Sequence, residues 1–109
     1  HMELIGNVTG KNVVLVDDMV DTAGTLTKAA DLMMERGALS VRAICTHPIL
    51  SGNAYERLEN SKLEELIVTD SIPLSQESSK IRVLGCANLF ADVMTKVHQN
   101  KSISSQFVM

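Results

Sequence analysis

Aromatic side chains are scarce in this chain of 109 residues, which has no tryptophan, one tyrosine and two phenylalanines. Modules that bind single-stranded nucleic acid stack the bases on aromatic side chains, and this chain offers few of them. Its net charge is −3, and it has no run of lysine or arginine that could neutralise a phosphate backbone. We therefore expect no nucleic-acid partner.

Long apolar runs are lacking as well. No stretch approaches the ~20 residues that a membrane-spanning helix needs, and no charged segment followed by an apolar one resembles a signal peptide. Cysteine is limited to Cys45 and Cys86, which form no CxxC pair. Buried free thiols are therefore expected, rather than a disulfide or a metal site. These absences predict a cytoplasmic protein with no membrane partner.

The chain does contain a sizeable apolar fraction. Hydrophobic residues make up 45% of it and charged residues 21%, a balance typical of a globular domain. His1 and Met2 are typical of a short remnant of cloning, so residues 3–109 are expected to form one domain or part of a larger one. Because a chain of this length buries a modest share of its surface, large exposed apolar faces would need a partner.

Apolar patterning predicts strands and helices in alternation. β-branched runs bounded by polar residues indicate strands, and apolar residues at spacings of three and four indicate helices. Gly37 is expected to end the first helix, and Ser51 to cap the second. The order of elements predicts an α/β fold with a mainly parallel sheet flanked by helices. The strands are predicted at residues 12–16, 40–45, 66–69 and 81–84, and the helices at residues 24–36, 51–60 and 87–98.

Each predicted helix has one apolar face, and the face of the second helix is expected to point inward. These faces consist of Leu26, Ala29, Ala30 and Met33 in the first helix, Ala54, Tyr55 and Leu58 in the second, and Phe90, Val93, Met94 and Val97 in the third.

Two adjacent acids follow the first predicted strand. In an open parallel sheet, ligands bind outside the carboxyl ends of the strands, which is where Asp17 and Asp18 are expected. Adjacent carboxylates repel each other unless cations, hydroxyl donors or solvent stabilise their charge. Vicinal sugar hydroxyls suit this role, because each hydroxyl donates one hydrogen bond to an ionised acceptor.

The start of the next helix offers the opposite chemistry. Asp21, Thr22, Ala23, Gly24 and Thr25 open this helix, and free amides at a helix N-terminus favour an anion such as phosphate. Small residues at 23 and 24 let a ligand approach the main chain, and the glycine tolerates a positive φ. The segment thus offers acceptors for hydroxyls and donors for phosphate, a combination that suits ribose 5-phosphate.

Simpler roles exist for these residues. Asp21 or Thr22 could only cap the helix, and Asp17 with Asp18 could be a solvated strand end; the ordered string VVLVDDMVDTAGT favours the binding loop. The roles of two residues outside this loop stay open. His47 is favoured as a packed strand-end residue over a part of the site, and Asp70 either lines the cleft or begins a turn.

The string VVLVDDMVDTAGT resembles the loop that binds phosphoribosyl pyrophosphate (PRPP) in type I phosphoribosyltransferases and in ribose-phosphate pyrophosphokinases, the PRPP synthetases. Outside the loop, residues 5–107 resemble the synthetases. The segments that carry this resemblance are GNVTGKNVVLVDDMVDTAGTL, THPILSGNAYERLENSKLEELIVTDSIP and KSISSQF.

The resemblance implies a partial phosphoribosyltransferase-like fold at residues 3–109, the C-terminal domain of a synthetase. Such enzymes transfer the diphosphoryl group of ATP to ribose 5-phosphate with Mg²⁺, and they assemble as homo-oligomers. Asp17 and Asp18 would hold the ribose hydroxyls without being direct metal ligands, and residues 21–25 would hold the 5-phosphate. Ser102 and Ser104 would lie near an effector anion site between subunits.

The resemblance also implies what this chain lacks. The N-terminal domain, with the ATP and Mg²⁺ residues, and the loop with the catalytic basic residues lie outside it, so the chain holds no catalytic residue and is expected to be inactive alone. Three alternatives remain: a non-catalytic synthetase-like regulatory subunit, a type I phosphoribosyltransferase, and a signalling receiver domain. The last leaves residues 21–25 without a role.

Overall fold

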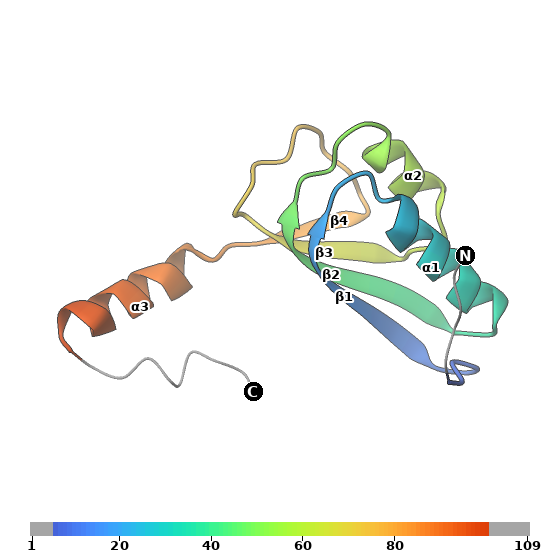
Figure 1. Ribbon diagram of the computed structural model, residues 1–109, viewed down its shortest axis with the longest axis horizontal. Coiled ribbons are helices and arrows are strands. Elements are labelled where there is room, and N and C mark those ends of the chain that lie inside the picture. Colours follow the sequence, from blue (N-terminus) through green and yellow to red (C-terminus); the bar gives the residue numbers. More distant parts are fainter. Residues whose placement is uncertain (1–5, 101–109) are drawn as a thin grey trace.

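The computed structural model describes residues 6–100, which form one four-stranded sheet and three helices (Figure 1). None of these helices is both long and apolar enough to cross a membrane. The elements along the chain are β1 (Asn12–Val20), α1 (Gly24–Glu35), β2 (Ser40–Pro48), α2 (Ala54–Asn60), β3 (Glu65–Thr69), β4 (Ile81–Leu84) and α3 (Ala87–His98).

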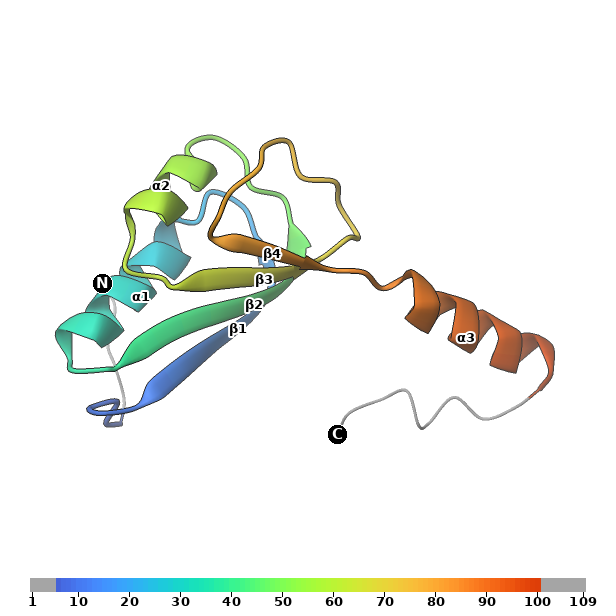
Figure 2. The ribbon, with the colours of Figure 1, turned by 180° about the vertical axis from the view of Figure 1, so that it is seen from behind.

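The sheet is entirely parallel, and its strands follow the order β1-β2-β3-β4. Helices α1 and α2 lie against the same face of this sheet, as Figures 1 and 2 show from opposite sides. The predicted α/β fold with a parallel sheet is confirmed. Because all strands run the same way, their carboxyl ends and the loops that follow share one edge of the molecule.

The core lies between the sheet and these two helices. On β2 and β3 buried residues alternate with more exposed ones, because successive side chains of a strand point to opposite faces. The α2 face was predicted correctly, and on α1 Leu26 and Ala30 are buried whereas Ala29 and Met33 are partly buried. The core comprises Val20, Ala23, Leu26, Ala30, Ala38, Val41, Ala43, Cys45, Leu50, Ala54, Tyr55, Leu58, Leu63, Leu66 and Val68.

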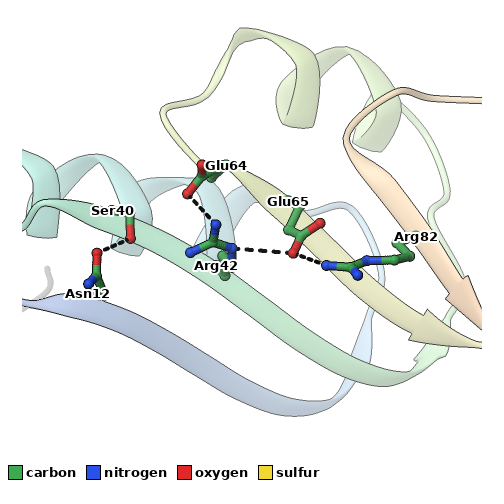
Figure 3. A network of polar contacts seen from close by, with 6 residues as sticks. All are labelled: Asn12, Ser40, Arg42, Glu64, Glu65 and Arg82. Carbon is green, nitrogen blue, oxygen red and sulfur yellow. Dashed lines mark hydrogen bonds and ion pairs between the residues drawn. The ribbon is translucent and has the colours of Figure 1, made fainter.

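No helix within residues 6–100 covers the other face of the sheet. Val14 and Val16 expose 54% and 78% of their surface there, although parallel sheets are normally covered on both faces. Charged residues cross the same face beside them (Figure 3). Arg42 forms ion pairs with Glu64 (3.1 Å) and Glu65 (3.2 Å), and Glu65 also pairs with Arg82. This face therefore combines an apolar surface with a row of ion pairs.

Helix α3 extends away from the sheet (Figure 2). No residue of α3 is buried, and Phe90, Met94 and Val97 each expose more than half of their surface. The span of α3 was predicted correctly. Its predicted apolar face is exposed, because no element of the described part of the chain buries it.

Several predicted boundaries are also wrong. β1 continues through the two acids to Val20, because its pairing with β2 extends to the pair Val20 and Pro48. α2 begins at Ala54 after Asn53, so Ser51 does not cap it. Gly37 does end α1: its φ is 95°, and the N–H groups of Gly37 and Ala38 donate to the carbonyls of Met34 and Met33.

Candidate functional site

A pocket lies at the junction between β1 and α1. Its volume is about 280 Å³, which suits a small ligand. The pocket brings together six of the seven residues predicted for the sugar-phosphate site, with Asp18 as the exception. Its lining consists of Asp17, Met19, Val20, Asp21, Thr22, Ala23, Gly24, Thr25 and Leu26.

The turn into α1 is made by Ala23, which adopts a left-handed conformation with φ 63° and ψ 10°. The sequence suggested Gly24 for this role, but the φ of Gly24 is not positive. A left-handed conformation costs a non-glycine residue about 1–2 kcal/mol. Such strain is typical of functional loops, and here it turns the chain directly into the first helical turn.

The main-chain amides at this turn have no hydrogen-bond acceptor among residues 6–100. Within that range, no hydrogen bond uses the N–H of Thr22, Ala23, Gly24, Thr25 or Leu26, and no side chain caps α1. The first bond of the helix runs from the Thr27 N–H to the Ala23 carbonyl (3.0 Å). A row of unpaired donors at a helix N-terminus attracts an anion.

The acceptors of the same turn are occupied by the segment that follows β2. The N–H of Leu50 donates to the Val20 carbonyl (3.1 Å), and the N–H of Ser51 donates to the Asp21 carbonyl (2.9 Å). The Ser51 hydroxyl donates to the Asp21 carboxylate. Ser51 therefore anchors the loop, a role that sequence spacing could not indicate because 30 residues separate the partners.

Arg57 of α2 completes this contact. Its Nη1 atom donates to the Thr22 carbonyl at 3.0 Å. The same atom lies 3.4 Å from the place that a Cβ on Gly24 would occupy. No sequence pattern indicated a basic residue at this loop, because Arg57 belongs to a different helix.

The two acids differ in position. Asp17 pairs in register with the buried Cys45 and lines the pocket, whereas Asp18, the next residue of the strand, does not line it. Because adjacent residues of a strand point to opposite faces of the sheet, the two carboxylates leave β1 on opposite sides. Burial raises the pKa of the Cys45 thiol, and the charges of Asp17 and Asp18 raise it further.

Asp70 belongs to a second strand-to-helix junction. Its Oδ1 atom accepts hydrogen bonds from the Cys86 N–H (3.1 Å) and the Cys86 thiol (2.7 Å), at the start of α3. The bond from the thiol, and to a lesser extent the bond from the N–H, lowers the pKa of the Asp70 carboxyl. The bond to Asp70 in turn raises the pKa of the Cys86 thiol. Cys86 is only partly buried, in contrast to our expectation.

His47 joins the ends of β2 and β3. Its Nδ1 atom lies 3.0 Å from the Ser71 hydroxyl oxygen, and this hydroxyl donates to the Thr46 carbonyl (2.9 Å). His47 does not line the pocket, so the structure agrees with a strand-end role.

Comparison with known proteins gives the family. The family model described as the phosphoribosyl synthetase-associated domain matches residues 1–108. The chain belongs to this phosphoribosyl synthetase-associated family. It is 54% identical over 107 residues to the ribose-phosphate pyrophosphokinase of Wolinella succinogenes, covering 98% of this chain and 35% of the relative. It is 50% identical over 107 residues to that of Campylobacter jejuni, with the same coverage.

A solved structure of the family resembles this chain. The crystal structure of the phosphoribosylpyrophosphate synthetase from Mycobacterium smegmatis superposes with a TM-score of 0.84 at 38% identity. This match covers 88% of the present chain and 33% of the other. The chain thus spans about a third of the length of its relatives.

Two predictions concern sites other than the pocket. Among residues 6–100, no group of three or more His, Cys, Asp or Glu side chains is placed to hold a metal ion. Ser102 and Ser104, which the family resemblance implies near an effector anion, lie outside the described residues.

Proposed function

We propose that this chain is the C-terminal part of a ribose-phosphate pyrophosphokinase, and that it binds the ribose 5-phosphate. Relatives with that name are 50–54% identical over almost the whole chain. The neighbouring gene sequence tests the position: a long continuation after Met109 with none before His1 would contradict it.

The observation that carries the binding proposal is the row of open amides from Thr22 to Leu26 in the pocket at the start of α1. These donors, with the helix dipole, would hold the 5-phosphate. The Asp17 carboxylate, at the other end of the same pocket, would accept hydrogen bonds from the ribose hydroxyls. Asp18 is part of the proposal as a second acceptor that approaches from the opposite face of the strand.

The contribution of this chain to the reaction is positioning. The parent enzyme would transfer the β,γ-diphosphoryl group of ATP to the C1 hydroxyl of ribose 5-phosphate, giving PRPP and AMP. A fixed phosphate and fixed ribose hydroxyls hold that C1 hydroxyl in one place, which removes rotational freedom before the transfer. The chain spans about a third of the length of its relatives, and the ATP site and the catalytic basic residues would lie in the remainder, so we propose that the chain alone is inactive.

Magnesium is a cofactor of the proposed parent enzyme rather than of the described residues. The carboxylates of Asp17 and Asp21 line one pocket, but no set of three ligands surrounds a cation position in residues 6–100. The metal and the ATP would therefore be held by residues outside this part. In this proposal the pocket acids bind hydroxyl groups.

The proposal includes a cytoplasmic homo-oligomer. The uncovered sheet face supports self-association, because Val14, Val16, Ile44 and Leu84 expose apolar surface there. Sedimentation velocity that shows a monomer at high concentration would contradict it.

The binding proposal is tested by amide NMR of the ¹⁵N-labelled chain, titrated separately with ribose 5-phosphate, inorganic phosphate and ribose. We expect ribose 5-phosphate to shift residues 17–26, inorganic phosphate to shift the part from residue 22 to 26, and ribose alone to bind far more weakly. Shifts elsewhere, or none at all, would contradict the proposal. Release of AMP from ATP and ribose 5-phosphate by the chain alone would contradict its inactivity.

A further inference from the structure

We infer that the segment from Leu50 to Arg57 holds the β1–α1 loop in its anion-binding shape, with Arg57 as the positioning residue for the phosphate. This inference rests on the proposed function, because it assigns a supporting part to the same pocket. It concerns residues that do not line the pocket themselves.

The first argument is the separation of donors and acceptors in the loop. The carbonyls of residues 20, 21 and 22 accept bonds from Leu50, Ser51 and Arg57, in that order. The amides from residue 22 to 26 have no acceptor in the described part of the chain. When the acceptors of a turn are fixed on one side, its donors stay oriented toward the other side, which is the side a phosphate would approach. The segment thereby prepares the site before a ligand arrives.

The second argument is the placement of Arg57. The guanidinium bonds to the Thr22 carbonyl at 3.0 Å and lies directly beside Gly24, 3.4 Å from a Cβ position there. A permanent positive charge at this place stabilises a phosphate dianion on the neighbouring amides. The Arg57 guanidinium makes only this one hydrogen bond within residues 6–100, so a single substitution removes the contact.

The third argument is that the segment is firmly held. Ala54 and Leu58, which flank Arg57 on α2, are fully buried. Leu50 is buried and adopts a left-handed conformation with φ 51°. This strained conformation brings its N–H to the Val20 carbonyl. A loop bonded to such an anchor keeps its own shape.

The test compares three variants of the 109-residue chain. Arg57→Met removes the charge and the donor but keeps the length of the side chain, and Arg57→Lys restores the charge and one donor. Arg36→Met, the control, removes the same charge at the far end of α1. Each variant is titrated with inorganic phosphate and with ribose 5-phosphate, and ¹⁵N relaxation is measured for residues 22–26 without ligand.

We expect Arg57→Met to weaken both ligands by a similar factor of about 10, because a hydrogen bond to a charged group is lost near the phosphate and not near the ribose. Residues 22–26 should become more mobile on the picosecond-to-nanosecond timescale without ligand. Arg57→Lys should recover part of the affinity, and Arg36→Met should stay within a factor of two of the unaltered chain.

The outcomes separate the two proposals. If the unaltered chain binds neither ligand, the proposed function fails, and the relaxation data alone decide the role of Arg57. If the chain binds and Arg57→Met changes neither affinity nor mobility, the role of Arg57 is refuted while the proposed function remains. A loss confined to ribose 5-phosphate would also refute it, because the effect would then lie at the ribose.

Discussion

Two strand-to-helix junctions lie at the same edge of this sheet, and they treat the helix N-terminus differently. At α1 the amides from residue 22 to 26 have no acceptor in the described chain, and the carbonyls are held by another segment. At α3 the Asp70 carboxylate already accepts the Cys86 N–H and thiol. One junction is open to an anion, and the other carries an anionic side chain of its own.

The difference shows that a helix N-terminus alone does not make an anion site. Both junctions follow a parallel strand, and neither helix has a side-chain cap from its N-cap residue. The α1 junction is further distinguished by the buried Ala23, the pocket and the anchor from Leu50 to Arg57. By contrast, no residue of α3 is buried.

The largest effect on ribose 5-phosphate binding should come from placing a carboxylate at the start of α1, as Asp70 does at the start of α3. The variant Gly24→Asp places a carboxylate among the open amides. A Cβ at this position makes ordinary contacts, the nearest at 3.4 Å, so the fold should persist. Ribose 5-phosphate binding should weaken by about 100-fold, since two like charges a few ångströms apart repel by several kcal/mol at the effective dielectric of a protein surface.

The matched control is Gly24→Asn, which has the same size without the charge. Calorimetric titration of both variants separates repulsion from steric filling. Equal losses in the two variants would mean that space rather than charge governs this site.

A smaller effect is expected from the acids of β1. Asp17→Asn should weaken ribose 5-phosphate by about 10-fold, because hydrogen bonds to a charged acceptor are worth about 1.5–3 kcal/mol. The same change should leave inorganic phosphate binding unchanged or slightly stronger. Asp18→Asn should weaken ribose 5-phosphate less than Asp17→Asn does, since Asp18 does not line the pocket. NMR titration of both variants measures this, and equal effects would show that both carboxylates reach the ribose.

The smallest effect concerns the occupied junction. The pKa of Asp70 lies below its ordinary value of 3.8, so its contribution to folding is present above that value and is lost as the pH falls through the lowered pKa. We expect the start of α3 to loosen only in acid, as followed by the Cys86 amide shift during a pH titration. Asp70→Asn should abolish this titration and leave phosphate binding unchanged.

The same pair gives a second readout at alkaline pH. The hydrogen bond to Asp70 raises the pKa of the Cys86 thiol. The thiol therefore keeps its proton and this bond at pH values below the ordinary thiol pKa, and both are lost as the pH rises through the raised pKa. Iodoacetamide should therefore alkylate Cys86 faster in Asp70→Asn than in the unaltered chain. Equal rates would contradict the contact.

The local sequence pattern was sufficient to predict the α/β architecture and the position of the loop between β1 and α1. The strand β4 and the helix α3 were predicted to the residue, because each has a clear apolar period and polar boundaries. The residues of the pocket are neighbours in sequence, so their chemistry could be read from one string. Gly24 was noted as the residue that tolerates a positive φ, but Ala23 adopts it, and the packing of this buried alanine is not visible in the sequence.

Contacts between residues far apart in the chain could not be predicted from the sequence pattern. Ser51 was expected to cap a helix, but its hydroxyl bonds Asp21, 30 residues earlier. Arg57 gave no signal, because its partner Thr22 is 35 residues away. The apolar period of α3 was predicted correctly, but period alone does not tell which surface such a helix contacts, and within residues 6–100 it contacts none that buries it.

The uncovered face of the sheet ties the stability of this chain to its surroundings. A molecule that covers Val14, Val16 and Ile44 can bind only when the strands are paired, because the unfolded chain has no such surface. Binding of this kind raises the free energy of unfolding by RT ln(1 + [L]/Kd), about 2.7 kcal/mol at a hundredfold excess over Kd. The melting temperature of this domain is therefore a property of the mixture it is in, and not of its sequence alone.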